Sequence, residues 1–135
     1  MMQVVRGARE MVAGMAPELK SGAYVFCAAG DRDWRALEPL AMFREAEGVS
    51  LILERDAARA AGFPIEAPMV LITLNVYSAL DGVGLTAAVA SALAEAGIAC
   101  NMVAALNHDH VFIPADRAEE ALGILKALQA AASAP

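Results

Sequence analysis

Short runs of apolar residues, separated by polar or glycine-containing segments, recur along the chain. A run of roughly four to eight apolar residues bounded by turn residues is typical of a buried β-strand. Strands are therefore predicted at residues 24–28, 40–44, 49–53, 69–76, 98–105 and 110–113. Between the second and third of these strands, Glu45-Ala46-Glu47-Gly48 has the length of a β-hairpin turn.

Apolar positions that recur at helical spacing predict the helices, together with residues that start and stop them. Pro17 stops the first helix, Asp56 can cap the second, and Gly62 ends it. Asp116 and Glu119 resemble a capping box at the start of the last helix. Helices are predicted at residues 4–15, 56–62, 85–96 and 117–129.

Part of the sequence repeats after 60 positions. Strand, hairpin, strand and a helix with an aspartate near its start occur in both copies. The matching residues are Met42, Phe43, Leu51, Ile52, Leu53, Asp56, Ala58 and Ala61 against Met102, Val103, Val111, Phe112, Ile113, Asp116, Ala118 and Ala121. Upstream, residues 29–39 are too short and polar to match the helix at 85–96. The sequence therefore predicts two related halves, 1–63 and 64–135, the first of them degenerate.

Composition excludes several classes of partner. The chain has 135 residues, of which 59% are hydrophobic and 5% aromatic, and a formal net charge of −6. Nucleic acids and anionic membrane surfaces both require clustered Lys and Arg, and the chain has no basic run. The scarcity of aromatic residues argues against stacking surfaces for bases or sugars. We therefore expect neither nucleic-acid binding nor membrane binding.

Three features indicate a soluble cytoplasmic protein. Cys27 and Cys100 lie in apolar, strand-like segments, and so small a number of cysteines is typical of reduced thiols in the cytosol. The first ten residues have no apolar core of a signal peptide. Residues 83–106 are long enough to span a bilayer, but Gly97 and Asn101 interrupt them and most of their apolar residues are alanine.

The motif Gly82-x-Gly84-x-x-Ala87 fits the relaxed dinucleotide-binding fingerprint. Such a site requires further parallel crossovers and an acidic residue about 20 positions later. Position 102 is a methionine, and only residues 106–109 separate the next two predicted strands. That distance permits an antiparallel hairpin and no parallel crossover. The motif is therefore interpreted as a turn before a helix.

The order strand, glycine turn, helix, strand, hairpin, strand, helix is the split β-α-β element of ferredoxin-like folds. The segment VYSALDGVGLTAAVASALAEAGIACNMVAA resembles an ACT domain, the small regulatory module of amino-acid metabolism. In this segment Gly84-Leu85 matches the end of the family's loop, and Gly97-Ile98-Ala99-Cys100-Asn101 matches its second strand. The resemblance implies an α+β fold of two βαββαβ halves, with antiparallel sheets covered by helices.

The paired arrangement resembles the regulatory region of aspartate kinases and the ACT repeats of cytosolic arginine sensors. The segments YVFCAA, FREAEGVSLIL and HDHVFIPADRAEEAL resemble small stand-alone bacterial proteins with two ACT-like halves. This resemblance covers nearly the whole chain. It implies a non-catalytic regulatory protein, a homodimer joined through edge strands and helix faces, and no cofactor.

The resemblance also implies a small effector, usually an amino acid, held by the turn after the first strand of an ACT domain and by the start of its helix. Glycines let backbone N–H groups approach a ligand, and a helix N-terminus favours a carboxylate. The carboxylate is expected at Gly82, Val83, Gly84 and Leu85, the amino group at Asp81, and an orienting amide at Asn101. The alternative is that Asp81-Gly82 is only a turn and Gly84 a position of close packing.

His108 and His110 are the only histidines, and at this spacing on a strand they project from the same face. They are weak candidates for metal ligands, because further ligands would have to come from other segments or subunits. The alternative is a hairpin corner whose histidines form local hydrogen bonds or line a subunit contact. No serine or cysteine has an evident base beside it, so covalent catalysis is not expected.

Three hypotheses follow from the sequence. The first is a regulatory protein that senses a small amino acid at the turn of the second half or at a dimer interface. The second is an interaction module that docks on a metabolic enzyme or transporter without a small-molecule ligand. The third is a metal-dependent enzyme that uses the two histidines.

Overall fold

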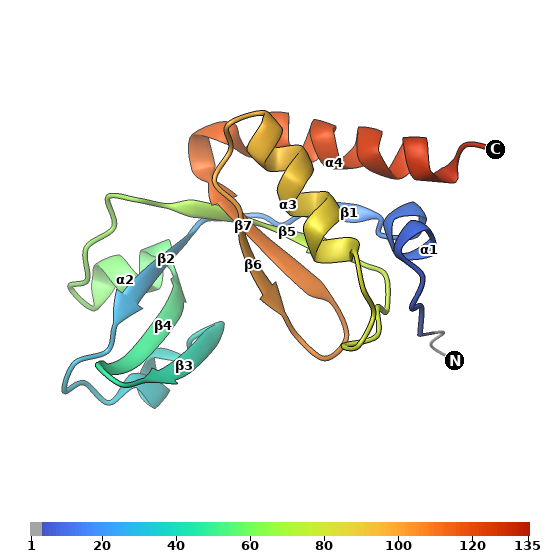
Figure 1. Cartoon of the computed structure of the whole chain (residues 1–135). Helices are drawn as coiled ribbons and strands as arrows, with labels where there is room; N and C mark the ends of the chain where they lie inside the picture. The colour runs from blue at the N-terminus through green and yellow to red at the C-terminus, as the bar shows by residue number, and fades with distance from the viewer. Residues whose placement is uncertain (1–3) are drawn as a thin grey trace. The chain divides into compact units, whose positions relative to one another are not determined.

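The structure, a computed structural model, describes residues 4–135, which form two compact units (Figure 1). One unit is Ser21–Met69. The other joins the N-terminal residues up to Lys20 with Val70–Pro135. The predicted boundary between residues 63 and 64 concerns the two sequence halves and stays a prediction. In space, the beginning of the chain belongs with the second half.

The unit Ser21–Met69 is an antiparallel sheet with two short helices packed against it. Strand β4 lies between β2 and β3, and Met69 extends the sheet by pairing with Tyr24. The elements are β2 (Tyr24–Ala28), η1 (Trp34–Leu37), β3 (Ala41–Glu45), β4 (Gly48–Glu54) and α2 (Arg55–Ala60). Strands at 24–28, 40–44 and 49–53 were predicted, so the strands and the hairpin of this unit are confirmed.

The core of this unit is built from alternate strand residues and one helix face. Its buried members are Val25, Ala29, Leu51, Leu53, Ala58 and Phe63. Helix α2 ends as predicted, because Gly62 takes a φ of 83° and the Phe63 N–H bonds the Ala58 carbonyl at 2.9 Å. The prediction that Asp56 caps α2 is wrong. Glu54 is the residue before the helix, without a side-chain cap bond, and Asp56 lies inside the first turn.

The other unit has the ferredoxin-like arrangement that the sequence predicts. Its strands lie in the order β1, β5, β7, β6, and β1–β5 and β6–β7 are antiparallel pairs. Helices α3 and α4 lie side by side on one face of the sheet (Figure 1). The elements are α1 (Ala8–Ala13), β1 (Pro17–Leu19), β5 (Met69–Leu74), α3 (Leu85–Glu95), β6 (Asn101–Ala104), β7 (Asp109–Pro114), η2 (Ala115–Arg117) and α4 (Ala118–Ser133).

The core of this unit lies between the sheet and its helices. It takes alternate residues from the two central strands, because successive side chains of a strand point to opposite faces. The buried members are Ile72 and Leu74 of β5, Val111 and Ile113 of β7, Leu85, Val89 and Leu93 of α3, Ala121 and Leu125 of α4, Val76 and Ile98 from the connections, and Met11, Val12 and Met15 from the beginning of the chain. Strand β1 was not predicted, although Pro17, which was expected only to stop a helix, is its first residue.

The repeat in the sequence is reproduced in the strand registers. In β3–β4, Met42 pairs with Leu51, and in β6–β7, Met102 pairs with Val111. All four pairs of β6–β7 have a counterpart shifted by 60 positions in β3–β4. The two halves therefore share one hairpin geometry, each hairpin leading into the following helix.

Two predicted elements are shorter than expected. The helix predicted at 4–15 covers only Ala8–Ala13, because Val5 instead forms a bridge with Ser78. We call residues 4–15 the N-terminal segment. The strand predicted at 98–105 begins only at Asn101, because the Ile98 N–H bonds the Leu93 carbonyl at 3.0 Å and so completes the end of α3.

The predicted capping box of the last helix is wrong. Helix α4 begins after a 3-10 turn, its preceding residue is Arg117, and no side chain caps it. The Arg117 guanidinium instead donates to the carbonyl of Ala96 at 3.0 Å and to that of Gly97 at 3.5 Å, both at the end of α3. Between residues 4 and 135, no helix is long and apolar enough to cross a membrane.

Candidate functional site

The loop of residues 75–84, between β5 and α3, contains the predicted ligand-binding turn. The Gly82 N–H donates to the Ala79 carbonyl at 2.9 Å and closes a turn. Gly84 directly precedes α3 with a φ of 115°, which side chains rarely tolerate. Its carbonyl accepts the bond of the Ala88 N–H at 2.9 Å. The backbone of this loop therefore requires glycine at position 84.

The N-terminal segment packs directly on this loop. The Val5 N–H donates to the Tyr77 carbonyl at 2.8 Å, and the Ala79 N–H donates to the Val5 carbonyl at 2.9 Å. A Cβ atom on Gly84 would lie 2.6 Å from the Cβ of Ala8, closer than real Cβ contacts. Gly84 is therefore a position of close packing, and its contact with a ligand stays a prediction. The N-terminal segment forms one wall of the candidate site.

A cavity of about 110 Å³ lies beside the loop, and we call it the glycine-loop cavity. The predicted residues Gly82, Gly84 and Leu85 line it, together with Ser78, Thr86 and Asp109. The Leu85 side chain is buried in the core, so its backbone is what a ligand could use. The cavity thus combines the N-terminal end of α3 with polar groups from the loop and from β7.

Asp109, the first residue of β7, supplies the buried acidic group of this cavity. Its side chain is 7% exposed, and its Oδ2 accepts a hydrogen bond from the Ser78 hydroxyl at 3.2 Å. It lies on the same face of β7 as Val111 and Ile113, which pack in the core. A buried carboxylate can bind a cation such as an ammonium group. The N-terminal end of a helix can bind an anion.

The sequence places Asp109 in the loop 106–109 between two predicted strands, so it does not predict the burial of this residue. The signal that could have found it is the alternation of 109, 111 and 113 along one strand, which places all three on one face. In the structure Asp109 is a buried strand residue instead of a loop residue. Strand β7 extends the strand predicted at 110–113 by one residue at each end.

Three predicted site residues lie outside the glycine-loop cavity. Asp81 is exposed and pairs with Arg6, with 3.5 Å between the Arg6 Nε and the Asp81 Oδ1. The Val83 side chain is 81% exposed. The Asn101 side chain donates to the Phe112 carbonyl at 3.5 Å. None of Asp81, Val83 and Asn101 lines the cavity. The structure therefore brings together the glycines and Leu85, but not the predicted partner for the amino group or the predicted orienting amide.

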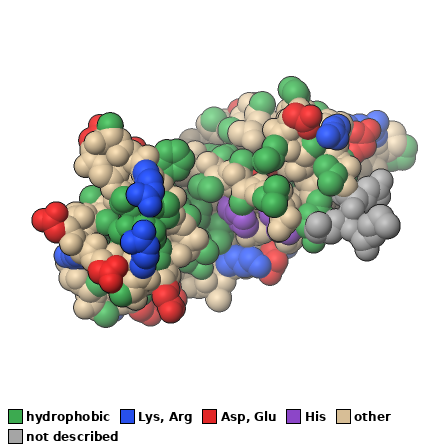
Figure 2. Space-filling model, turned by 90° about the horizontal axis from the view of Figure 1, so that it is seen from below, with side chains coloured by type: hydrophobic (Ala, Val, Ile, Leu, Met, Phe, Trp, Pro, Cys, Tyr) green, Lys and Arg blue, Asp and Glu red, His purple; other side chains and the backbone are tan. Residues whose placement is uncertain are grey.

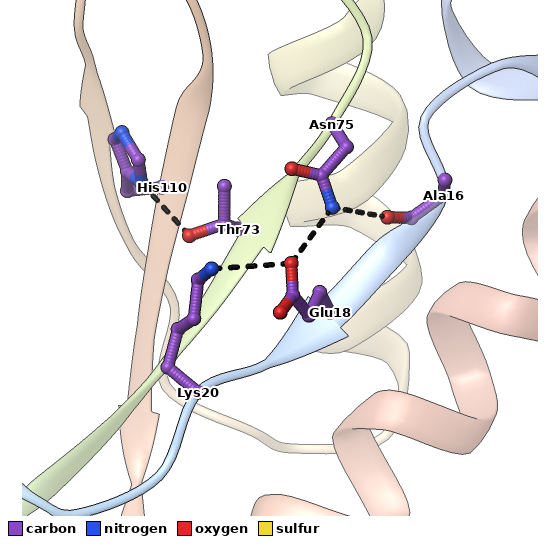
Figure 3. Close-up of polar contacts among 6 residues, drawn as sticks. All are labelled: Ala16, Glu18, Lys20, Thr73, Asn75 and His110. Carbon is purple, nitrogen blue, oxygen red and sulfur yellow. Dashed lines mark hydrogen bonds and ion pairs between the residues drawn. The ribbon is translucent and has the colours of Figure 1, made fainter.

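His110 in β7 and His108 before it contact β5 and the loop that follows β5, at residues 37 and 32 positions away in the sequence. The Nδ1 of His110 lies 3.0 Å from the hydroxyl of Thr73, which is 3% exposed (Figure 3). The Nδ1 of His108 lies 3.4 Å from the Val76 carbonyl, and its ring centroid is 4.7 Å from that of Tyr77. Over residues 4–135, no three His, Cys, Asp or Glu side chains gather in a way that could hold a metal ion.

Burial lowers the pKa of His110, and the charge of His108 acts in the same direction. On β1, Glu18 Oε1 accepts a hydrogen bond from Asn75 at 3.2 Å and lies 3.1 Å from the Lys20 ammonium (Figure 3). These contacts lower the pKa of Glu18, the hydrogen bond with Lys20 most strongly. The polar groups of Figure 3 thus connect β1, β5 and β7.

On the face drawn in Figure 2, acidic and basic side chains are interspersed and form no broad basic surface.

The unit Ser21–Met69 has a cavity at the corresponding place. It measures about 370 Å³ and lies between the turn after β2 and the tip of the β3–β4 hairpin. Asp31, Glu45 and Glu47 line it. Val49 lies 60 positions before Asp109 and has the same place in the register of its hairpin. The buried carboxylate therefore belongs to the second half alone.

Comparison with known proteins places this fold in a family. Two models of the ACT domain match residues 7–70 and 66–127. A solved structure from Vibrio cholerae, described as a protein of unknown function and possible transport protein, is 46% identical in sequence. The match covers 87% of this chain and 92% of that one, with a TM-score of 0.80. The chain belongs to the ACT-domain family.

Two other solved structures share the fold of this ACT protein. The ligand-free regulatory subunit of aspartate kinase from Thermus thermophilus is 16% identical over 85% of this chain and 97% of that one, with a TM-score of 0.55. The corresponding subunit from Thermus flavus is 13% identical over 83% and 95%, with a TM-score of 0.51. No curated protein matches the chain. ACT domains are regulatory modules that bind ligands, and this is the general role that the family gives to the protein.

Proposed function

We propose that this ACT protein is a non-catalytic regulator that binds a small amino acid in the glycine-loop cavity. The observation that carries the proposal is the pairing of two opposite electrostatic ends in one cavity. Asp109 provides a buried carboxylate, and the N-terminus of α3, which follows Gly84, provides backbone N–H groups. An amino acid presents an ammonium group to the first and a carboxylate to the second.

The size of the cavity selects the smallest amino acids. Its volume is about 110 Å³, and one water molecule in the liquid takes about 30 Å³. Glycine or alanine is of the right size, whereas leucine or arginine would have to displace Met11, which lines the cavity and is 1% exposed. Met11 belongs to the N-terminal segment, so a larger ligand requires that segment to move.

A thermal-shift screen against the twenty amino acids tests this proposal. A ligand that binds only the folded chain at a hundredfold excess over its Kd adds about 2.7 kcal/mol of stability. We expect glycine or alanine to raise the Tm, and Asp109→Asn to abolish the rise. Asp81→Asn is the matched control, because Asp81 is an exposed carboxylate of the same loop outside the cavity.

Two results would contradict the proposal. The first is a flat response of the folded wild-type protein to all small amino acids. The second is an undiminished response of Asp109→Asn, because an amide carries no charge for an ammonium group. The same proposal includes a homodimer, which sedimentation of the purified protein would test. It also includes a location in the cytoplasm, which fractionation of cells would test.

A second candidate function is an interaction module that docks on a metabolic enzyme or transporter without a small-molecule ligand. The observation that favours it is that the N-terminal segment packs against Gly84, so that the chain itself occupies part of the space a ligand would approach. This function predicts no amino-acid response and a protein partner retained on immobilised protein. Loss of that partner in the exposed-surface variant Val83→Asp would place the contact on this loop.

A further inference from the structure

We propose that the sheet of the unit Ser21–Met69 has an open face that docks one basic amphipathic helix of a partner protein. The residues of this open face alternate with the core residues of the same strands, because successive side chains of a strand point to opposite sides. They are Tyr24, Phe26 and Ala28 of β2, Ala41, Phe43 and Glu45 of β3, and Ser50, Ile52 and Glu54 of β4. The glycine-loop cavity belongs to the other compact unit, so this inference stands whether or not an amino acid binds there.

The middle of the open face is apolar and includes two exposed aromatic side chains. In one row across the sheet, Phe26 pairs with Ile52, and Ile52 pairs with Ala41. In the next row, Ser50 lies between Phe43 and the last residue of β2. Phe26 is 49% and Phe43 is 71% exposed. Exposed apolar side chains that lie together on one face are typical of a surface that a partner covers.

The size of the open face fits one α-helix. Neighbouring strands lie about 4.8 Å apart, so three strands span about 10 Å, and a helix with its side chains is about 10–12 Å wide. The seven residues of β4 extend over about 20 Å, which is the length of a helix of about 14 residues. A sheet buries an apolar face against helices or a second sheet, and α2 already lies on the core side.

The charges at the ends of the open face are acidic, and they select a basic partner. The strand positions of this face all lie within the described residues, and none of them is Lys or Arg. Glu45 lies at one end of the face and Glu54 at the other. Beyond Glu45, the cavity of about 370 Å³ adds Asp31 and Glu47, and Ser50 of the open face lines it too. Lysines near the ends of a docked helix would therefore meet carboxylates.

The second half of the chain lacks this combination of side chains. Val103 and Ala105 stand 60 positions after Phe43 and Glu45. The two hairpins have the same register, so the shared fold does not require an exposed phenyl ring or a carboxylate at these positions. Their presence in the first half alone favours a role in binding.

A second copy of this chain fits the open face less well than a basic helix. In a two-fold symmetric contact the same surface meets itself. The carboxylates of Glu45 and Glu54 would then come close to those of the other copy, and like charges repel each other. The chain as a whole also carries a net charge of −6, which attracts a basic partner and repels a second copy.

Fluorescence anisotropy of three labelled peptides of about 14 residues, titrated with the full chain, tests the inference. The basic peptide has leucines along one face of a helix and lysines on the other. The acidic peptide has glutamate in place of every lysine. The scrambled peptide has the composition of the basic peptide in an order that forms no apolar face, so it measures attraction by charge alone. We expect saturable binding of the basic peptide, and at least tenfold weaker binding of the other two.

Variants assign the binding to the open face. Phe43→Ser should weaken binding of the basic peptide at least tenfold, and Phe26→Ser provides the same test in another strand if the first variant fails to fold. Glu47→Gln should weaken binding at least threefold, because it removes a carboxylate of the acidic end. Leu106→Ser and Glu95→Gln are the matched controls, because both residues are exposed and belong to the other compact unit.

Four outcomes would overturn the inference. The first is the absence of saturable binding of the basic peptide to the folded chain. Equal affinity for the acidic or the scrambled peptide would remove the basic amphipathic helix as the occupant. Equal weakening by Leu106→Ser and Phe43→Ser would place the peptide outside the open face. A dimer in sedimentation that Phe43→Ser converts to a folded monomer would assign the open face to a second copy of the chain.

Discussion

The two halves of the chain share a hairpin and the start of a helix, and they differ in the connection before it. The hairpins β3–β4 and β6–β7 have the same register. Between β2 and β3 the chain has twelve residues, 29–40, and only the single turn η1; between β5 and β6 it has twenty-six, 75–100, and the helix α3. The shared part forms the framework, and the added part forms the candidate site. Function in this protein is therefore expected where the halves differ.

The repeat turns this difference into single-residue comparisons. Asp109, His110 and Arg117 of the second half correspond to Val49, Ser50 and Ala57 of the first. The backbone is equivalent at the first two of these positions, so there the halves differ only in their side chains. Substitutions that exchange them, or that break the loop found in one half only, test what each half does.

The largest effect is expected for Gly84→Val. A valine at position 84 would have to adopt a φ of 115°, and its Cβ would lie 2.6 Å from the Cβ of Ala8. The left-handed conformation costs about 1–2 kcal/mol, and overpacking costs typically 1–3 kcal/mol. We expect a loss of about 3 kcal/mol in the free energy of unfolding, measured by urea denaturation.

Gly30→Val is the matched control in the first half. Gly30 also has a positive φ, of 62°, but no atom lies within 4 Å of a Cβ built on it. Only the cost of the backbone conformation remains, about 1–2 kcal/mol. Equal losses at the two positions would show that the N-terminal segment does not pack on the 75–84 loop.

The next effect concerns the buried carboxylate. Asp109→Val gives the second half the residue of the first half. Because a buried carboxylate with one bonding partner is costly, its replacement by an apolar side chain is expected to raise the stability by about 1 kcal/mol. The same variant should lose the Tm shift with glycine or alanine, since the partner of the ammonium group is removed.

The reciprocal variant Val49→Asp is the control for this prediction. Val49 packs against the core of its unit, so a carboxylate there should destabilise the chain by about 1–3 kcal/mol. It should not create a second amino-acid response, because no helix follows the turn of the first half. A clear stability loss in Asp109→Val would instead assign Asp109 a structural role.

The comparison also explains which parts of the structure were predictable from the sequence. The hairpins and α3 carry strong local periodicity, and their positions were predicted to within a few residues. Strand β1 has three residues, and its partner, Ile72–Leu74, lies more than fifty positions away. Nothing local in the sequence marks such a strand. The burial of Asp109 likewise depends on the pairing and packing of β7.

The helix starts were mispredicted for a related reason. Aspartates at 56 and 116 matched a capping pattern, but the helices begin earlier and later than that pattern requires. At α4, the start of the helix is fixed by a contact with a different helix, from Arg117 to the end of α3. A local motif cannot anticipate a contact across 21 positions. The glycine turn was predictable because its requirement is local.

A smaller effect is expected at this contact. Arg117 donates to Ala96 at 3.0 Å and to Glu120 at 2.7 Å, and the hydrogen bond with Glu120 raises the pKa of Arg117. The first half has Ala57 at this position and no helix to connect. We expect Arg117→Ala to lower the free energy of unfolding, since a cation at a helix C-terminus is stabilising. Urea denaturation measures it.

Glu120→Gln separates the two partners of Arg117. It removes the exposed ion pair, which contributes little to stability because solvent screens it, and keeps the bond to the end of α3. It should therefore cost less than Arg117→Ala. If the two variants lose the same stability, the ion pair is what matters, and the contact with α3 contributes nothing measurable.

The smallest effect concerns the pH dependence that His110 gives to the second half, where the first half has Ser50. His110 lies 3.0 Å from the buried Thr73 hydroxyl. Burial, reinforced by the charge of His108, lowers its pKa below the usual histidine value of about 6.5. As the pH falls below 6.5, the unfolded chain therefore binds a proton more readily than the folded chain, and stability decreases. Above that pH this contribution is fully present.

His110→Gln tests this contribution, because glutamine can still form a hydrogen bond with Thr73 but does not titrate. Between about pH 6.5 and pH 5, the wild-type protein should lose more stability than the variant, and above pH 7 the two urea-denaturation profiles should run parallel. Parallel profiles over the whole range would show that His110 has the same pKa in the folded and unfolded chains. A steeper loss in the variant would mean that protonated His110 is stabilised by the fold, which the burial of this strand argues against.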